Sequence, residues 1–123
     1  MDRKPWLKHY DDQIPPTLAP YPDHGFHVFL EQSAARYPDR PCTLFKGRAV
    51  TYREMNAQAD RIAAGLAAMG VRKGDRVGVL IPNTPQFVMA FYGILKAGAV
   101  VVATNPLYTA HEMAYQLRDA GVE

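Results

Sequence analysis

The chain has 123 residues, of which 48% are hydrophobic and 21% are charged, proportions that are typical of a globular domain with a buried core. Its formal net charge of +2 is too small to indicate binding to nucleic acid or to an anionic lipid surface. A single cysteine, Cys42, excludes a disulfide within the chain and fits a reducing compartment. The amino terminus has no apolar segment of the secretory kind, so we expect no secretory signal.

Residues 1–23 are predicted to form an extended arm that precedes the folded body. Apolar anchors on one short helical turn are followed by four prolines, which hold a backbone extended: Trp6, Leu7, Tyr10 and Ile14, then Pro15, Pro16, Pro20 and Pro22. Such an arm either lies across another surface, of its own domain or of a partner subunit, or frays as a terminus. The sequence favours neither alternative.

The first half of the body is predicted to contain two helices separated by a hairpin. In chain order these are a helix over 26–37, two short strands within 42–52 that turn at Lys46-Gly47, and a helix over 51–70. Thr51 and Glu54 form a capping box, in which the hydroxyl and the carboxylate satisfy backbone amides at the start of the helix. Gly70 is placed to end that helix.

The second half predicts a right-handed βαβ unit followed by a helix. The elements are a strand over Val77–Ile81, a helix over Pro85–Ala97, a strand over Ala99–Ala103, and a helix that ends at Gly121. Thr84 is expected to cap the first of these helices, and Thr109 with Glu112 forms a second capping box.

The last helix carries an apolar stripe, formed by Met113, Leu117 and Ala120, that we expect to be buried. Val122 would then begin a further strand. Because a helix in an α/β layer packs on the strands at both of its ends, we expect these residues to be an incomplete part of a larger layer.

Residues 87–103 are apolar apart from Lys96, and their length approaches that of a membrane span. A charge near the middle of a span is costly, and Gly98 is placed to end a helix before a β-branched run. This pattern favours a buried helix followed by a buried strand, so we predict no transmembrane segment.

Few residues could carry chemistry by their spacing alone. His24 and His27 lie three positions apart, but a metal needs further ligands, and only Asp23 and Glu31 are near, so surface or helix-start histidines are the favoured interpretation. Cys42 lies in a predicted strand, where an apolar role is favoured over that of a nucleophile. No glycine-rich phosphate loop is present. We therefore predict no catalytic residue and no metal ligand in this chain.

The strongest functional signal is architectural. Two polar segments follow predicted strands, Pro82-Asn83-Thr84 and Thr104-Asn105-Pro106. In open α/β sheets, ligands bind outside the carboxyl ends of the strands, so these segments form the candidate site. The alternative is that they only end strands and cap helices, because turns and caps select the same residue types.

Four segments, in this order, resemble the start of adenylate-forming acyl-CoA synthetases: TYREMN, GVRKGDRVGVLIPN, GILKAGAVVV and NPLYT. That superfamily also contains aryl-CoA ligases, firefly luciferase and peptide-synthetase adenylation domains. The arm segment WLKHYDDQIPPTL and the segment NPLYTAHEMAYQLRDAG are similar to the bacterial long-chain fatty-acid–CoA ligase branch. The resemblance covers essentially the whole chain. It implies that residues 24–123 are an incomplete α/β N-terminal subdomain, with a short β-hairpin and parallel βαβα units.

The resemblance also implies a parent enzyme that joins a fatty acid to coenzyme A through an acyl-adenylate, with ATP and magnesium as cofactors. In the family, the phosphate-binding loop, the ribose-binding aspartate and the catalytic lysine lie downstream, and none can be matched to a residue here. The 123 residues are therefore expected to be inactive alone and to bind none of these cofactors. The loop around Asn105 is implied to border the CoA nucleotide or the acyl chain.

Two alternatives stay open. The chain could come from an aryl-CoA ligase or another adenylate-forming enzyme, or it could be a free-standing α/β binding module. The expected partners are the remainder of the ligase chain, a fatty acid and CoA, without nucleic acid. A homo-oligomer is a further option, because an incomplete sheet exposes edges and apolar faces. The expected location is cytoplasmic, with peripheral contact at the inner face of the membrane left open.

Overall fold

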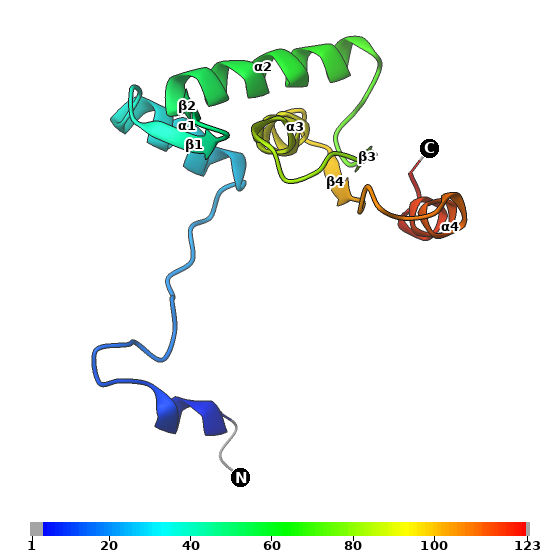
Figure 1. The fold of residues 1–123 in the computed structure, drawn as a ribbon. Coiled ribbons are helices and arrows are strands. Elements are labelled where there is room, and N and C mark those ends of the chain that lie inside the picture. The colour runs from blue at the N-terminus through cyan, green and yellow to red at the C-terminus, as the bar shows by residue number, and fades with distance from the viewer. Residues whose placement is uncertain (1–3, 123) are drawn as a thin grey trace.

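The computed structural model describes residues 4–122 and confirms the α/β class (Figure 1). In chain order the described elements are a 3-10 helix η1 (Pro5–His9), α1 (His27–Arg36), β1 (Pro41–Phe45), β2 (Arg48–Thr51), α2 (Tyr52–Ala68), β3 (Arg76–Val79), α3 (Pro85–Lys96), β4 (Val100–Ala103) and α4 (Ala110–Ala120). Strands β1 and β2 form an antiparallel hairpin. Strands β3 and β4 are parallel neighbours, and α3 makes the crossover between them.

The predicted ends of the two parallel strands were one or two residues wrong. Strand β3 stops at Val79 instead of Ile81. The carbonyl of Val79 accepts the N–H of Thr104 at 2.9 Å. The chain then turns away toward Pro82, which has no N–H to extend the ladder. Strand β4 starts at Val100 instead of Ala99, because the N–H of Ala99 donates to the carbonyl of Ile94 and so belongs to the end of α3.

One motif closes α2, α3 and α4. A glycine in the left-handed conformation is followed by a residue whose N–H donates to a carbonyl five positions earlier: Val71 to Leu66 at 3.0 Å after Gly70, Ala99 to Ile94 at 3.1 Å after Gly98, and Val122 to Leu117 at 2.9 Å after Gly121. The hydrogen bonds of this ending satisfy carbonyls that a helix leaves unpaired at its C-terminus. The amide of Val122 closes α4, and the expectation that this residue begins a further strand stays a prediction, because it is the last residue that the structure describes.

Helices α2 and α3 cross at a glycine. A Cβ placed on Gly93 would lie 2.6 Å from Ile62 Cγ2 and 3.1 Å from the carbonyl oxygen of Ala59, so no larger residue fits this crossing. Ala59 itself is fully buried, next to Met55 and Leu30. On the other side of α3, Ile94 packs with Val79 and Ala99 and joins the helix to the parallel strands.

Lys96 is a buried charge that connects the helices of the body. Only 8% of its side chain is exposed, and its Nζ lies 3.2 Å from Glu31 Oε1 on α1 and 2.5 Å from Asp60 Oδ1 on α2. The same ammonium donates to Asn56 Oδ1 at 2.8 Å. Three acceptors satisfy its three donors, which a buried ammonium requires. The residue that breaks the apolar run of 87–103 therefore holds α1, α2 and α3 together.

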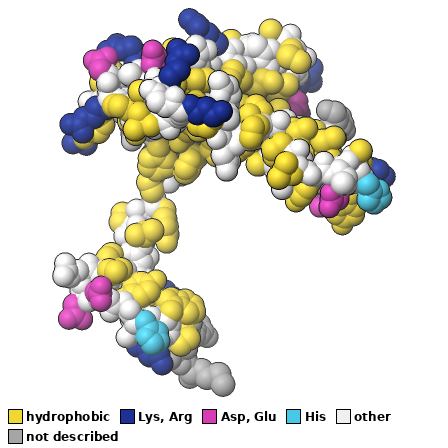
Figure 2. Space-filling view, in the orientation of Figure 1, with side chains coloured by type: hydrophobic (Ala, Val, Ile, Leu, Met, Phe, Trp, Pro, Cys, Tyr) yellow, Lys and Arg dark blue, Asp and Glu magenta, His cyan; other side chains and the backbone are white. Residues whose placement is uncertain are grey.

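The arm and α4 lie at the periphery of the body (Figure 1). Beyond η1 the arm has no regular secondary structure up to α1, and Figure 2 shows its hydrophobic side chains facing outward. Exposed apolar residues of the arm include Trp6, Tyr10, Ile14, Leu18 and Tyr21. The stripe of α4 that we expected to be buried, Met113, Leu117 and Ala120, is only half-buried, because it covers little more than β3. No helix within residues 4–122 is both long and apolar enough for a membrane span.

We predict opposite effects for two glycine-to-alanine changes. Gly93→Ala should lower the free energy of unfolding by about 1–3 kcal/mol, because the new methyl group overlaps Ile62. Gly65→Ala on the exposed side of α2 meets no atom within 4 Å and should raise it by about 0.5–1 kcal/mol. Urea unfolding of the two variants measures both effects. Equal stabilities would show that α2 and α3 do not approach closely at Gly93.

A second prediction concerns the buried ammonium. A double-mutant cycle of Lys96→Met with Asp60→Asn should give a coupling free energy above about 1 kcal/mol, because the amino group is desolvated. The matched pair Arg53–Asp39 is 3.0 Å apart but its side chains are 64% and 83% exposed, and its cycle should give less than about 0.5 kcal/mol. Similar couplings for the two pairs would contradict a buried role for Lys96.

Candidate functional site

The two polar segments predicted to form the site do come together. The bond from Thr104 to Val79 places the carboxyl ends of β3 and β4 side by side. A hollow of about 550 Å³ opens there, and it is lined by residues of both segments and by the start of α3: Ile81, Pro82, Asn83, Phe87, Ala103, Thr104, Asn105, Pro106 and Leu107. The candidate site is therefore a shallow, mostly apolar depression with amide and hydroxyl groups on its rim.

Asn105 shapes the loop after β4. Its Oδ1 accepts the N–H of Leu107 at 3.0 Å, and its backbone carbonyl accepts the N–H of Tyr108 at 3.1 Å. This is an Asx turn, in which the side chain takes the place of a backbone carbonyl. The turn carries the chain around Pro106 and leaves Leu107 87% exposed at the edge of the hollow. The side chain of Asn105 is thus committed through its oxygen to the turn.

Two further residues hold this loop in place at the end of β4. Thr104 is 5% exposed, and its hydroxyl lies 3.5 Å from the carbonyl of Val102. Gln116 of α4 donates from Nε2 to the carbonyl of Ala103 at 3.0 Å and so ties α4 to the end of β4. Sequence analysis missed Gln116. The available signal was its place beside Leu117 on the apolar stripe, where a polar residue needs a partner.

The start of α3 differs from the prediction. Thr84 occupies the N-cap position, but its hydroxyl makes no capping bond. Pro85 has no N–H, and the N–H of Phe87 donates instead to the backbone carbonyl of Thr84 at 3.0 Å. The hydroxyl of Thr84 therefore accepts no hydrogen bond from a backbone N–H of α3, and the expected side-chain cap was wrong.

Both capping boxes are confirmed. In α4 the N–H and the hydroxyl of Thr109 donate to Glu112 Oε2 at 2.8 Å and 2.7 Å, and in α2 Thr51 and Glu54 repeat the arrangement. These bonds stabilise the charged carboxylate and lower the pKa of Glu112 and of Glu54. The box on α4 fixes the far end of the Asn105 loop, since it begins one residue after Tyr108.

The other candidates do not form a site. His24 and Gly25 interact through the ring Nδ1 and the carbonyl oxygen at 3.1 Å, and the ring of His24 meets Phe29 edge-on. Within residues 4–122 no three His, Cys, Asp or Glu side chains lie close enough together to hold a metal ion. Burial raises the pKa of the Cys42 thiol, which favours its protonated form over the thiolate that a nucleophile requires.

Residues 30–123 match the model of the family described as AMP-binding enzyme. The chain is 48% identical over 120 residues to a long-chain-fatty-acid–CoA ligase of Bacillus subtilis, an alignment that covers 98% of this chain and 21% of the ligase. It is 39% identical over 101 residues to surfactin synthase subunit 1 of the same organism, covering 82% of this chain and 3% of the synthase. The chain therefore spans about a fifth of the length of the curated ligase it matches.

Solved structures of related proteins share the fold. A fatty acyl CoA synthetase of Mycobacterium tuberculosis superposes with a TM-score of 0.76 at 38% identity, covering 80% of this chain and 20% of that one. The NpsA N-terminal subdomain of Klebsiella oxytoca, in complex with 3-hydroxyanthranilyl-AMSN, gives 0.77 at 30% identity, covering 80% of this chain and 25% of that one. The hollow at the strand ends thus lies in an adenylate-forming fold, and the chain belongs to the AMP-binding enzyme family. Its sequence corresponds to the N-terminal region of long-chain fatty-acid–CoA ligases, as the motifs predicted.

We predict that the lowered pKa of Glu112 depends on Thr109. Because the folded-state pKa is depressed below its ordinary value of 4.5, the box stabilises α4 above that pH and is lost as pH falls through the folded pKa. Thr109→Ala keeps the bond from the backbone N–H, the larger cause of the lowered pKa, and removes the bond from the hydroxyl. The pKa of Glu112 should therefore rise part of the way toward 4.5, measured by carbon-13 NMR of the carboxyl group. Glu54 is the control in the same molecule, and its titration should not move. An unchanged Glu112 titration would contradict the bond from the Thr109 hydroxyl.

Proposed function

We propose that this chain is the N-terminal part of a long-chain fatty-acid–CoA ligase. The whole enzyme would convert a fatty acid and ATP into an acyl-adenylate and pyrophosphate, and CoA would then displace AMP to give acyl-CoA. The observation that carries the proposal is the extent of the match: the Bacillus subtilis ligase aligns over 98% of the chain, whereas the surfactin synthase aligns over 82%. An alignment over 120 of the 123 residues includes most of the arm.

The cofactors of such a ligase would be ATP, magnesium and CoA. Within residues 4–122 no cluster of carboxylates and histidines fits magnesium, and the sequence has no glycine-rich phosphate loop, so we assign none of these groups to a residue of this chain. We therefore propose that the 123 residues alone are inactive and that the remainder of the ligase polypeptide supplies the reactive groups. The cytoplasm is the proposed location, with peripheral membrane contact and self-association as further properties of the whole enzyme.

We propose in addition that the Asn105 loop borders the CoA nucleotide or the acyl chain. Three observations support this role. The loop lies at the carboxyl end of a parallel strand, it rims the hollow of about 550 Å³, and it holds Leu107 out of the core. Asn105 would act by fixing the turn that presents Pro106 and Leu107, so its effect on a ligand is indirect.

A second candidate is an aryl-CoA ligase or another adenylate-forming enzyme. It is favoured by the similarity to the NpsA subdomain and to an O-succinylbenzoate Coenzyme A synthetase of Bacillus subtilis, which gives a TM-score of 0.73 at 34% identity. The acid selected by the ligase separates the two candidates.

The ligase proposal is tested with a chimera in which this chain replaces the matching N-terminal segment of the Bacillus subtilis ligase. We expect AMP formation that requires oleate, ATP and CoA, at a rate within about tenfold of the parent. The reason is that the chimera receives the buried helix crossing at Gly93 and Ala59 together with the loop of the candidate site, so the contacts between them are kept. The isolated chain, assayed alongside, should form no AMP. A folded chimera that adenylates benzoate in preference to oleate would support the second candidate.

The role of Asn105 is tested in the same chimera with two variants. Asn105→Ala removes the oxygen that holds the Leu107 amide and should raise the KM for CoA or for oleate about three- to tenfold. Asn105→Asp keeps an acceptor oxygen for the turn and should retain KM values close to those of the chimera. Unchanged KM values for both substrates in Asn105→Ala would remove the loop from the proposed site.

A further inference from the structure

The loop that carries Asn105 is closed by a side chain of α4. Gln116 donates from Nε2 to the carbonyl of Ala103 at 3.0 Å, across 13 positions of the sequence. Between these two residues lie the whole loop and the capping box of Thr109 and Glu112, which fixes the start of α4. One side-chain bond therefore joins the two ends of the loop segment and ties the position of the loop to that of α4.

The acceptor of this bond is not used by the parallel ladder. The N–H of Thr104 donates to the carbonyl of Val79 at 2.9 Å, so the backbone groups of Thr104 point toward β3. Because these groups alternate in direction along a parallel strand, the carbonyl of Ala103 points away from β3. Ala103 also lines the hollow of the candidate site. Gln116 thus reaches the site through the backbone of a residue that borders it.

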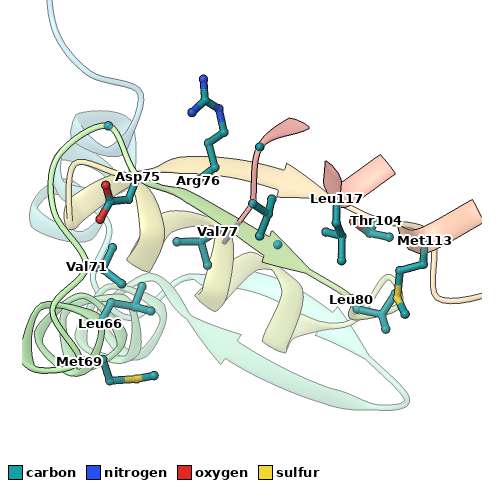
Figure 3. A pocket seen from close by; sticks show the side chains of 14 residues that line it. Leu66, Met69, Val71, Asp75, Arg76, Val77, Leu80, Thr104, Met113 and Leu117 are labelled. Atoms are coloured by element: carbon teal, nitrogen blue, oxygen red, sulfur yellow. The ribbon is translucent and has the colours of Figure 1, made fainter. Parts of the chain in front are cut away.

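Apolar contacts bring α4 to the end of β4, but they do not bond to the loop. Figure 3 shows Thr104, Met113 and Leu117 around one pocket of about 630 Å³. A Cβ on Gly78 would lie 3.1 Å from Leu117 Cδ2, so the helix also touches β3. Within residues 4–122, the bond from Gln116 is the only hydrogen bond that joins α4 to a strand.

The other end of the Gln116 amide is unsatisfied. Its Oε1 is buried, and no donor among residues 4–122 reaches it. A buried acceptor without a partner costs more free energy than a neutral hydrogen bond usually returns, whereas an apolar side chain of the same shape avoids the cost. Gln116 lies half-buried beside Leu117, where methionine would fit without this penalty. The amide therefore opposes the packing of α4 while its Nε2 holds the loop.

We propose that Gln116 is a positioning residue for the ligand of the hollow. It acts through Ala103, because its bond holds the carboxyl end of β4, and with it the Asn105 turn, against α4. The inference rests on the function proposed above, since the ligand is taken to be the CoA or the fatty acid of the ligase. A polar group that lowers local stability is expected where a sequence serves function instead of packing.

The proposal is tested in the ligase chimera with Gln116→Met, which keeps the length of the side chain and removes both the donor and the unpaired oxygen. The unfolding temperature should stay the same or rise, because Ala103 is exposed and water can replace the lost donor. The KM for the substrate that responds to Asn105→Ala should rise about three- to tenfold, with kcat changed less than about twofold. A residue with only a structural role would not give this combination.

Amide hydrogen exchange reads the loop directly. The amides of Leu107 and Tyr108, which bond to Asn105, should exchange about tenfold faster in Gln116→Met. The amide of Thr104, which bonds to Val79, should change less than about twofold. Gln58→Met is the matched control, because Gln58 is a half-buried glutamine of α2 whose side chain makes no hydrogen bond within residues 4–122. It should change neither the loop exchange nor the KM.

A double variant tests whether Gln116 and Asn105 act through one turn. If they do, the KM of Asn105→Ala combined with Gln116→Met should rise by less than the product of the two single increases. Increases that multiply would show that the two residues act independently.

Three results would overturn the proposal: a KM that Gln116→Met leaves unchanged, KM effects that multiply in the double variant, or a lower unfolding temperature with faster exchange at Thr104 as well. The last result would make Gln116 a structural residue of the sheet. Exchange does not depend on catalysis. An inactive chimera would therefore contradict the ligase proposal, while the rates at Leu107 and Tyr108 would still decide whether Gln116 holds the loop.

Discussion

The crossing of α2 and α3 is the constraint on which the rest of this structure depends. Gly93 lets the two helices approach until the carbonyl of Ala59 is within van der Waals reach. One turn further along α3, the ammonium of Lys96 binds Asp60 on the same neighbour and Glu31 on α1. Because α3 is also the crossover between β3 and β4, its position on α2 sets the position of the parallel pair. The carboxyl ends of the strands, and hence the hollow, follow from that placement.

The sequence predicts the fold well where one local signal decides the outcome. Thr51 with Glu54 and Thr109 with Glu112 mark two helix starts, and glycines mark the ends of α2, α3 and α4. These signals succeed because the bonds they imply join residues three to five positions apart. The resemblance added the family and its branch, which spacing alone does not contain.

The features that the sequence did not reveal arise from contacts between distant segments. Lys96 reads as an interruption of an apolar run, and its three acceptors lie 36 to 65 positions away on other helices. Thr84 resembles a cap, but competition from its own backbone carbonyl decides the bond. Gln116 has no partner until β4 and α4 are placed together. For the candidate site, the two loops were predicted, while the role of Asn105 in a turn required the geometry of Leu107.

The segments that join the helices and strands differ in how readily they could tolerate insertions or deletions as the family diverged. From α3 to β4 the chain has only Ala97, Gly98 and Ala99, and each of the last two amides closes the helix. An insertion there would displace β4 along β3. The opposite joints, 80–84 and 104–109, are longer and lie on the rim of the hollow. Differences in loop length can therefore accumulate on the face that carries the hollow, while the α3–β4 joint on the reverse side is kept at fixed length.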